Sequence, residues 1–98
     1  MKKYYFQYVN HCLTYYFRYH ISPQHRSESD SLNWKACDEA MSEFSDKDRA
    51  LFRIIYTGND TLPNSISKIS IEHGIDANSL WGVMNKLALT VAEKRGLV

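Results

Sequence analysis

The sequence contains few of the residues on which several classes of protein depend. Its two cysteines, Cys12 and Cys37, are too few for the disulfide framework of a small secreted domain, so reduced and buried thiols are expected. The four glycines are scattered and form no glycine-rich phosphate loop. No apolar run approaches the roughly 18 residues that a membrane span needs. We therefore expect a cytoplasmic protein with no membrane partner.

The net charge is also small, and groups that could form a catalytic or metal site are few. The formal net charge of +1 gives the chain no overall attraction to nucleic acid or to a membrane surface. His11 and Cys12 are adjacent, and neighbouring residues of a helix point in different directions, so the pair lacks metal-ligand spacing. No activated nucleophile with a neighbouring base is indicated. We therefore expect no enzyme, no metal site and no cofactor.

A chain of 98 residues suits one domain, 1–98, with a single modest core. Apolar residues recur at helical spacing and no strand pattern appears, so the sequence predicts an all-α fold of about five helices. An aromatic-rich N-terminal helix is expected within residues 1–20. After a polar loop that contains Pro23, a helical core is expected over residues 30–98.

The first expected helix is apolar on nearly all sides. One apolar stripe consists of Phe6, Val9, Leu13, Tyr16 and Phe17. A second stripe beside it consists of Tyr5, Tyr8, Cys12, Tyr15 and Tyr19. Such a helix is normally covered on more than one side, so the second stripe is expected to pack on a neighbouring element or on a second copy of the chain.

Tyrosine suits a half-hydrated surface, because its ring can be buried while its hydroxyl keeps a polar partner. We therefore place a partner or dimer interface at the tyrosines of the second stripe, namely Tyr5, Tyr8, Tyr15 and Tyr19. An alternative is a platform on which nucleic-acid bases stack, with phosphates bound by Lys2, Lys3 and Arg18.

Two further helices are expected before the last pair. The second runs from about residue 30 to residue 44. The third begins at the segment Ser45-Asp46-Lys47-Asp48, which resembles a capping box because a serine hydroxyl can accept a hydrogen bond from the third N–H. The apolar residues that the third helix is expected to turn inward are Leu51, Ile54 and Ile55.

The segment Ile66–Leu87 has the pattern of two helices joined by a very short turn. Gly74 stands in the turn, where a positive φ is needed that glycine adopts at little cost. Asp76 or Asn78 can cap the helix that follows. The segment therefore predicts a helix-turn-helix, with a long last helix that ends before Gly96.

Two segments resemble the fourth region of bacterial sigma factors and the small sigma-like helix-turn-helix regulators of phages and mobile elements. Residues Phe44–Leu51, FSDKDRAL, are similar to the opening of that region. Residues Ile69–Leu80, ISIEHGIDANSL, are similar to its helix-turn-helix core, and the two segments follow one another in the same order.

This resemblance implies a small DNA-binding transcriptional regulator whose last helix enters the major groove of double-stranded DNA. The residues at the matching positions, which we expect to contact DNA, are Asn78, Ser79, Trp81, Gly82, Asn85 and Lys86. Asparagine can read adenine edges, and serine can contact a phosphate. We expect such a regulator to form a dimer through the aromatic first helix.

An alternative is a protein-interaction module that uses the same scaffold. Its partner would be RNA polymerase or a host nucleoprotein complex, contacted by Trp81 and by the tyrosines of the first helix. Lys86 is the one positive charge among the candidate DNA contacts, although phosphate contacts normally supply most non-specific affinity. Trp81 beside Gly82 is typical of a protein contact, in which a large aromatic anchor lies next to a position without a side chain. Both interpretations stay open at this point.

Overall fold

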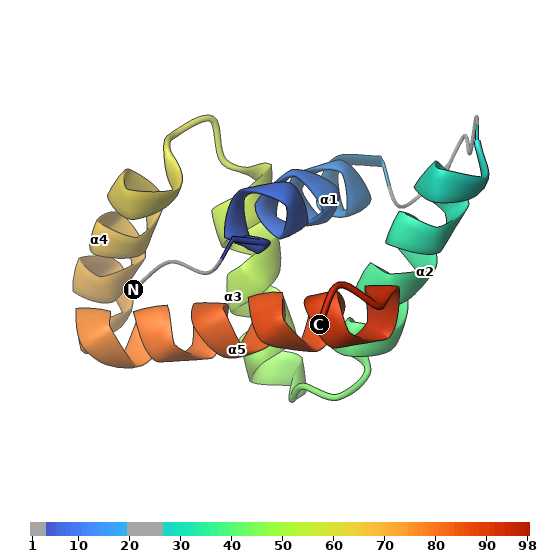
Figure 1. Ribbon diagram of the computed structural model, residues 1–98. Coiled ribbons are helices and arrows are strands. Elements are labelled where there is room, and N and C mark those ends of the chain that lie inside the picture. The colour runs from blue at the N-terminus through green and yellow to red at the C-terminus, as the bar shows by residue number, and fades with distance from the viewer. Residues whose placement is uncertain (1–3, 20–26) are drawn as a thin grey trace.

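The computed structural model, drawn in Figure 1, describes residues 4–19 and 27–98. Within these ranges the chain forms five α-helices and no β-strand, which confirms the predicted all-α fold. The helices are α1 (Phe6–Tyr19), α2 (Glu28–Met41), α3 (Asp46–Thr57), α4 (Leu62–His73) and α5 (Ala77–Arg95). No helix in this part of the chain is both long enough and apolar enough to cross a membrane. Lys2, Lys3 and the predicted loop around Pro23 lie outside the described residues.

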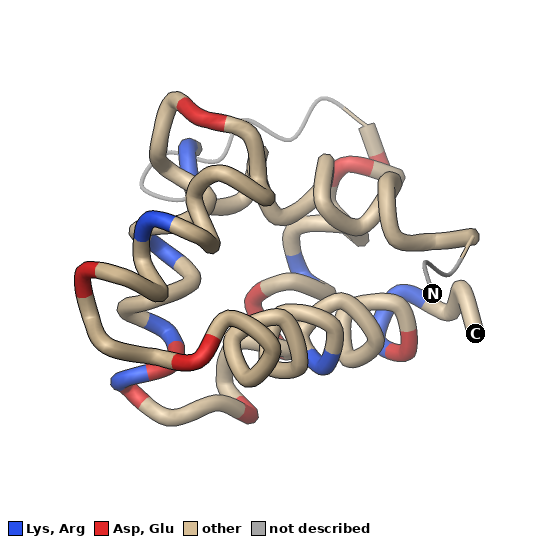
Figure 2. Tube along the Cα trace, turned by 90° about the vertical axis from the view of Figure 1, so that its left-hand side faces the viewer, with Lys and Arg blue, Asp and Glu red and all other residues tan. Residues whose placement is uncertain are grey.

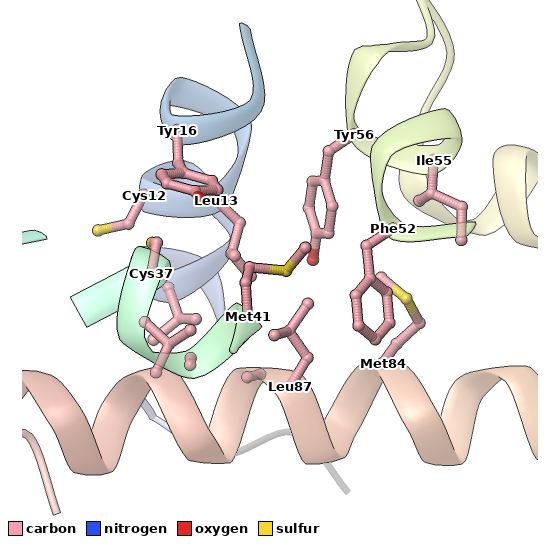
Figure 3. Close-up of a cluster of buried hydrophobic side chains, with 14 of the residues drawn as sticks. Cys12, Leu13, Tyr16, Cys37, Met41, Phe52, Ile55, Tyr56, Met84 and Leu87 are labelled. Carbon is pink, nitrogen blue, oxygen red and sulfur yellow. The ribbon is translucent and has the colours of Figure 1, made fainter. Parts of the chain in front are cut away.

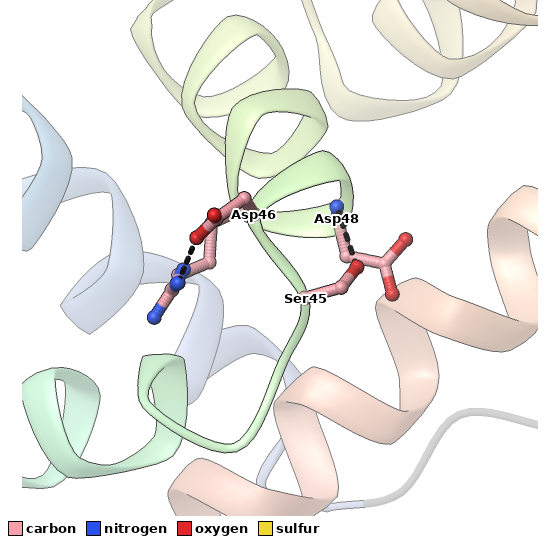
Figure 4. Close-up of polar contacts among 4 residues, drawn as sticks. Ser45, Asp46 and Asp48 are labelled. Atoms are coloured by element: carbon pink, nitrogen blue, oxygen red, sulfur yellow. Dashed lines mark hydrogen bonds and ion pairs between the residues drawn. The ribbon is translucent and has the colours of Figure 1, made fainter.

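Each helix after α1 begins at a residue whose side chain caps its first turn. The N-cap residues of α2 to α5 are Ser27, Ser45, Thr61 and Asp76. Each of these side chains accepts a hydrogen bond from the backbone N–H three residues later, which has no partner within the helix. Figure 4 shows the cap of α3, where Asp46 also forms an ion pair with Arg49. The predicted start of the third helix is therefore confirmed.

The end of α2 differs from the prediction. The helix ends at Met41, three residues before the predicted Phe44. The backbone N–H groups of Glu43 and Phe44 donate to the carbonyls of Ala40 and Met41, so the chain makes a tight turn before α3. The turn carries Phe44 into the core, where its ring meets the ring of Phe52 edge to face, with centroids 5.1 Å apart.

Helix α5 is the longest helix, and the others are arranged around it. Helix α2 packs along its C-terminal half, and α4 meets its N-terminal end (Figure 1). Helix α1 packs on α2, α3 and α5 together, while α3 packs on α1 and α4. The N-terminal helix is therefore part of the same packed unit as the helix-turn-helix.

All five helices contribute to one hydrophobic core, part of which is drawn in Figure 3. Its largest fully buried side chains are Val9, Leu13, Cys37, Phe52, Ile66, Leu80, Met84, Leu87 and Val91. Four of the nine belong to α5, and the other helices supply the rest. Because each helix gives at least one side chain to this cluster, the position of α5 depends on all the others.

The predicted inward face of α3 was wrong at Ile54. This side chain is 45% exposed, and the buried positions are taken by Leu51, Phe52, Ile55 and Tyr56. These four share one side of the helix, at the spacing i, i+1, i+4 and i+5, which excludes Ile54. The two aromatic rings bury more apolar area than an isoleucine does, so they decide which side faces the core.

Helix α1 is covered on two sides, as its composition predicts. Val9, Leu13 and Phe17 of the first stripe are buried, and so are Tyr5 and Cys12 of the second. The helices that pack on α1 are α2, α3 and α5. A neighbouring element of the same chain therefore covers this part of the second stripe.

Two buried tyrosines tie α1 to its neighbours through their hydroxyl groups. The Tyr56 hydroxyl donates to Asn10 Oδ1 at 2.7 Å, and the Tyr16 hydroxyl donates to Asp38 Oδ1 at 2.8 Å. Burial raises the pKa of both phenols above their ordinary range, so both remain protonated donors at neutral pH. Burial likewise raises the pKa of the Cys37 thiol, which keeps it in the unreactive protonated form.

Candidate nucleic-acid interface

The turn between α4 and α5 has the predicted glycine geometry. Gly74 lies in the left-handed region, at φ 62° and ψ 33°, and its backbone N–H donates to the Ser70 carbonyl. The backbone N–H of Ile75 donates to the same carbonyl at 3.0 Å, and the Ser70 hydroxyl donates to the Ile75 carbonyl. Because the carbonyl and the hydroxyl of Ser70 both form hydrogen bonds within the turn, the direction in which α5 leaves α4 is fixed.

The first turn of α5 is capped by Asp76, one of the two predicted caps. Asp76 Oδ2 accepts hydrogen bonds from the backbone N–H of Ser79 at 3.1 Å and from its hydroxyl at 3.4 Å. The carboxylate also lies at the positive end of the helix dipole. Asn78 is therefore not needed as a cap, and its exposed amide is available to a partner.

Beyond this turn, the two halves of α5 have different surroundings. Leu87, Ala88 and Thr90–Ala92 are buried. In the first half only Leu80 and Met84 are buried, Trp81 and Val83 are half-buried, and the other residues are exposed. We call the exposed side the outer face of α5, and it consists of Asn78, Ser79, Gly82, Asn85, Lys86 and Leu89. At about 3.6 residues per turn, these six positions share one side of the helix.

The outer face brings together five of the six residues that the sequence predicts as DNA contacts. Trp81 lies at its edge, because its ring is half-buried and packs against the core. Leu89 was missed, although it is 42% exposed. The sequence does indicate this exposure, because Leu89 follows Gly82 and Asn85 at helical spacing. It also lies outside the apolar stripe of α5.

A groove of about 380 Å³ runs between the outer face and the start of α1. The residues that line it include Tyr5, Phe6, Gly82, Asn85, Lys86 and Leu89. The groove therefore combines apolar surface from α1 and α5 with two polar side chains from the outer face.

Charges of both signs are interspersed over the side of the molecule that carries α4 and the start of α5 (Figure 2). Lys86 is the one basic residue of the outer face. Its ammonium group lies 5.9 Å from the centroid of the Phe44 ring, a cation–π contact that leaves the side chain exposed. This face can offer hydrogen bonds to a partner, but few contacts to phosphate groups.

The tyrosines predicted at a dimer interface are in different environments. Tyr5 is buried in the core of the chain, which corrects its expected place at a partner or dimer interface. Tyr8 is 41% exposed, and its hydroxyl exchanges hydrogen bonds with the Asn33 amide of α2. Tyr15 is half-buried, and the side chain of Tyr19 lies outside the described part of the chain. A dimer through Tyr8 and Tyr15 stays a prediction.

Among residues 4–19 and 27–98, no group of three or more His, Cys, Asp or Glu side chains is placed to hold a metal ion. Comparison of the chain with protein-family models, with curated proteins and with solved structures finds no match. The resemblance to sigma-like proteins therefore stays a prediction.

Proposed function

We propose that this protein is a small transcriptional regulator that binds double-stranded DNA with the outer face of α5. One observation carries the proposal: the chain leaves a row of uncharged hydrogen-bonding side chains exposed on the first half of α5, directly after a closed helix-turn-helix turn. A recognition helix needs this arrangement, because its side chains must reach base edges while the rest of the helix is held by the core.

In the proposed complex, α5 lies in the major groove and α4 crosses the DNA backbone. The Asn85 amide can donate to adenine N7 and accept from adenine N6, which makes two hydrogen bonds to one base. Gly82 has no side chain, so the helix backbone can approach the bases closely at this position. Lys86 is then the contact to a phosphate group.

Asn85→Ala and Lys86→Ala are expected to weaken DNA binding in different ways. Loss of the two hydrogen bonds to adenine should reduce the affinity of Asn85→Ala for a selected duplex by roughly fivefold or more. Lys86→Ala should reduce the slope of log affinity against log salt concentration by about one, because one phosphate contact is lost. Fluorescence anisotropy with a labelled duplex, selected from a random library and titrated at several salt concentrations, measures both quantities.

Lys94→Ala is the matched control, because Lys94 lies on the last turn of α5 and pairs with Glu43 at 2.7 Å, away from the outer face. Its affinity and its salt dependence should equal those of the unmodified protein. If Asn85→Ala and Lys86→Ala both bind the duplex as Lys94→Ala does, the outer face of α5 is not the DNA-binding surface.

The second candidate function is a protein-interaction module, and the environment of Trp81 favours it. The ring is half-buried at the edge of the outer face, next to the exposed Gly82. Trp81→Ala is then expected to retain the helical circular-dichroism spectrum. In a pull-down with purified RNA polymerase as the partner, this variant should no longer capture the polymerase. Capture that is retained by Trp81→Ala would exclude this tryptophan as the anchor.

A further inference from the structure

The groove beside the outer face of α5 has a lining with a distinct chemical character. Phe6, Ala88 and Leu89 supply apolar surface, and no carboxylate is among the lining residues. The exposed amide of Asn85 can both donate and accept hydrogen bonds at its edge. Lys86 also lines the groove, and its ammonium group lies 5.9 Å from the centroid of the Phe44 ring. The groove therefore suits a group that presents a small apolar surface beside a hydrogen-bonding edge.

Gly82 supports an occupant from outside the chain. Glycine in the interior of a helix lowers helix stability relative to alanine. Gly82 does not have the positive φ that would require glycine, and a Cβ placed on it would meet no atom within 4 Å. The packing of the chain itself therefore does not require glycine at this position. A group that approaches the helix closely from outside would require it.

We propose that α5 selects A·T base pairs, with the C5-methyl group of thymine entering the groove between Gly82 and Leu89. This inference rests on the proposed DNA-binding function. In the major groove, thymine presents a methyl group beside the O4 acceptor, and adenine presents the N7 acceptor and the N6 donor. Asn85 lines the groove next to Leu89, so one A·T step can meet both the amide and the apolar surface. Cytosine has no methyl group at this position, so a G·C pair cannot make this apolar contact.

The test compares duplexes that differ only in this methyl group. A mixed-sequence A·T duplex, about two helical turns long, is compared by fluorescence anisotropy with the same duplex carrying uracil in place of thymine. Each methyl group buried in the groove should raise affinity about fourfold, so the unmodified protein is expected to prefer thymine by at least that factor. A G·C duplex with and without 5-methylcytosine repeats the comparison on the other base pair, and its methylated form should bind more tightly.

Leu89→Ala is expected to bring the ratio of the thymine and uracil affinities close to one, because Leu89 supplies the apolar surface next to Asn85 that the methyl group would contact. Leu32→Ala is the matched control, since Leu32 is 43% exposed on α2 and does not line the groove. It should keep the full preference for thymine.

The outcomes separate the two proposals. Equal affinity of the unmodified protein for the thymine and uracil duplexes would overturn the methyl site but leave DNA binding in place. A preference that persists in Leu89→Ala would show that the methyl group is read elsewhere, which also overturns the inference. Absence of binding to every duplex at low salt would overturn the proposed function and this inference with it.

Discussion

Leu13→Ala is expected to lower the free energy of unfolding by about 2–5 kcal/mol, although Leu13 is far in the sequence from the helix-turn-helix. Its side chain is fully buried, and Figure 3 shows it directed from α1 into the cluster that also contains Met41 and Leu87. Removing the isobutyl group leaves a cavity that the close-packed surroundings fill only in part. Domains of this size have a total stability of roughly 5–15 kcal/mol, so the loss would be a large part of the whole.

Urea unfolding, followed by tryptophan fluorescence and by far-ultraviolet circular dichroism, measures this change. The two signals should give one common transition, because α1 and the helix-turn-helix share a core. Leu32→Ala, at a largely exposed position, should change stability by about 0.5 kcal/mol or less. A loss below about 1 kcal/mol for Leu13→Ala would mean that α1 contributes little to the core and that α2–α5 fold without it.

Phe52→Ala is expected to cost about 3–5 kcal/mol. The ring of Phe52 is fully buried, meets Phe44 edge to face at 5.1 Å and lies next to Met84 of α5 (Figure 3). It therefore connects α3 and the turn before it to the middle of α5. Edge-to-face aromatic pairs contribute about 0.5–1.5 kcal/mol beyond the burial of their area, so the alanine variant loses both terms.

Phe52→Leu is the matched variant for this position. It keeps much of the apolar volume but removes the aromatic pair, so its loss of stability should be clearly smaller than that of the alanine variant. The same urea experiment measures both. Similar losses for leucine and alanine would mean that the ring geometry, rather than the filled volume, determines the packing between α3 and α5.

Local signals in the sequence predicted the helices and several of their ends, although α2 ends three residues before its predicted end. Ser45 and Asp76 cap their helices as predicted. Gly74 and Gly96 have the positive φ of helix ends. These features depend on a few consecutive residues and on backbone geometry, so a sequence contains enough information to place them.

Features that depend on how elements pack together were harder to predict. Periodicity indicates that α1 has two apolar sides, but it does not show which element covers each side. Tyr5 was therefore expected at an interface, although it is buried within the chain. Ile54 was expected in the core because isoleucine is apolar, but Phe52 and Tyr56 determine which side of α3 is buried. Leu89 was not predicted, since its exposure follows from the space that α1 leaves open beside α5.

Burial of the second half of α5 affects how its outer face can bind a partner. Because Leu87 and Val91 anchor the helix in the core, the first half is already helical before any partner arrives. Association then needs no coupled folding step, and the entropy of ordering the helix is lost during folding of the domain rather than during binding. The backbone amides of α5 beyond its first turn should therefore show slow hydrogen exchange in the free protein, with rates set by opening of the whole domain.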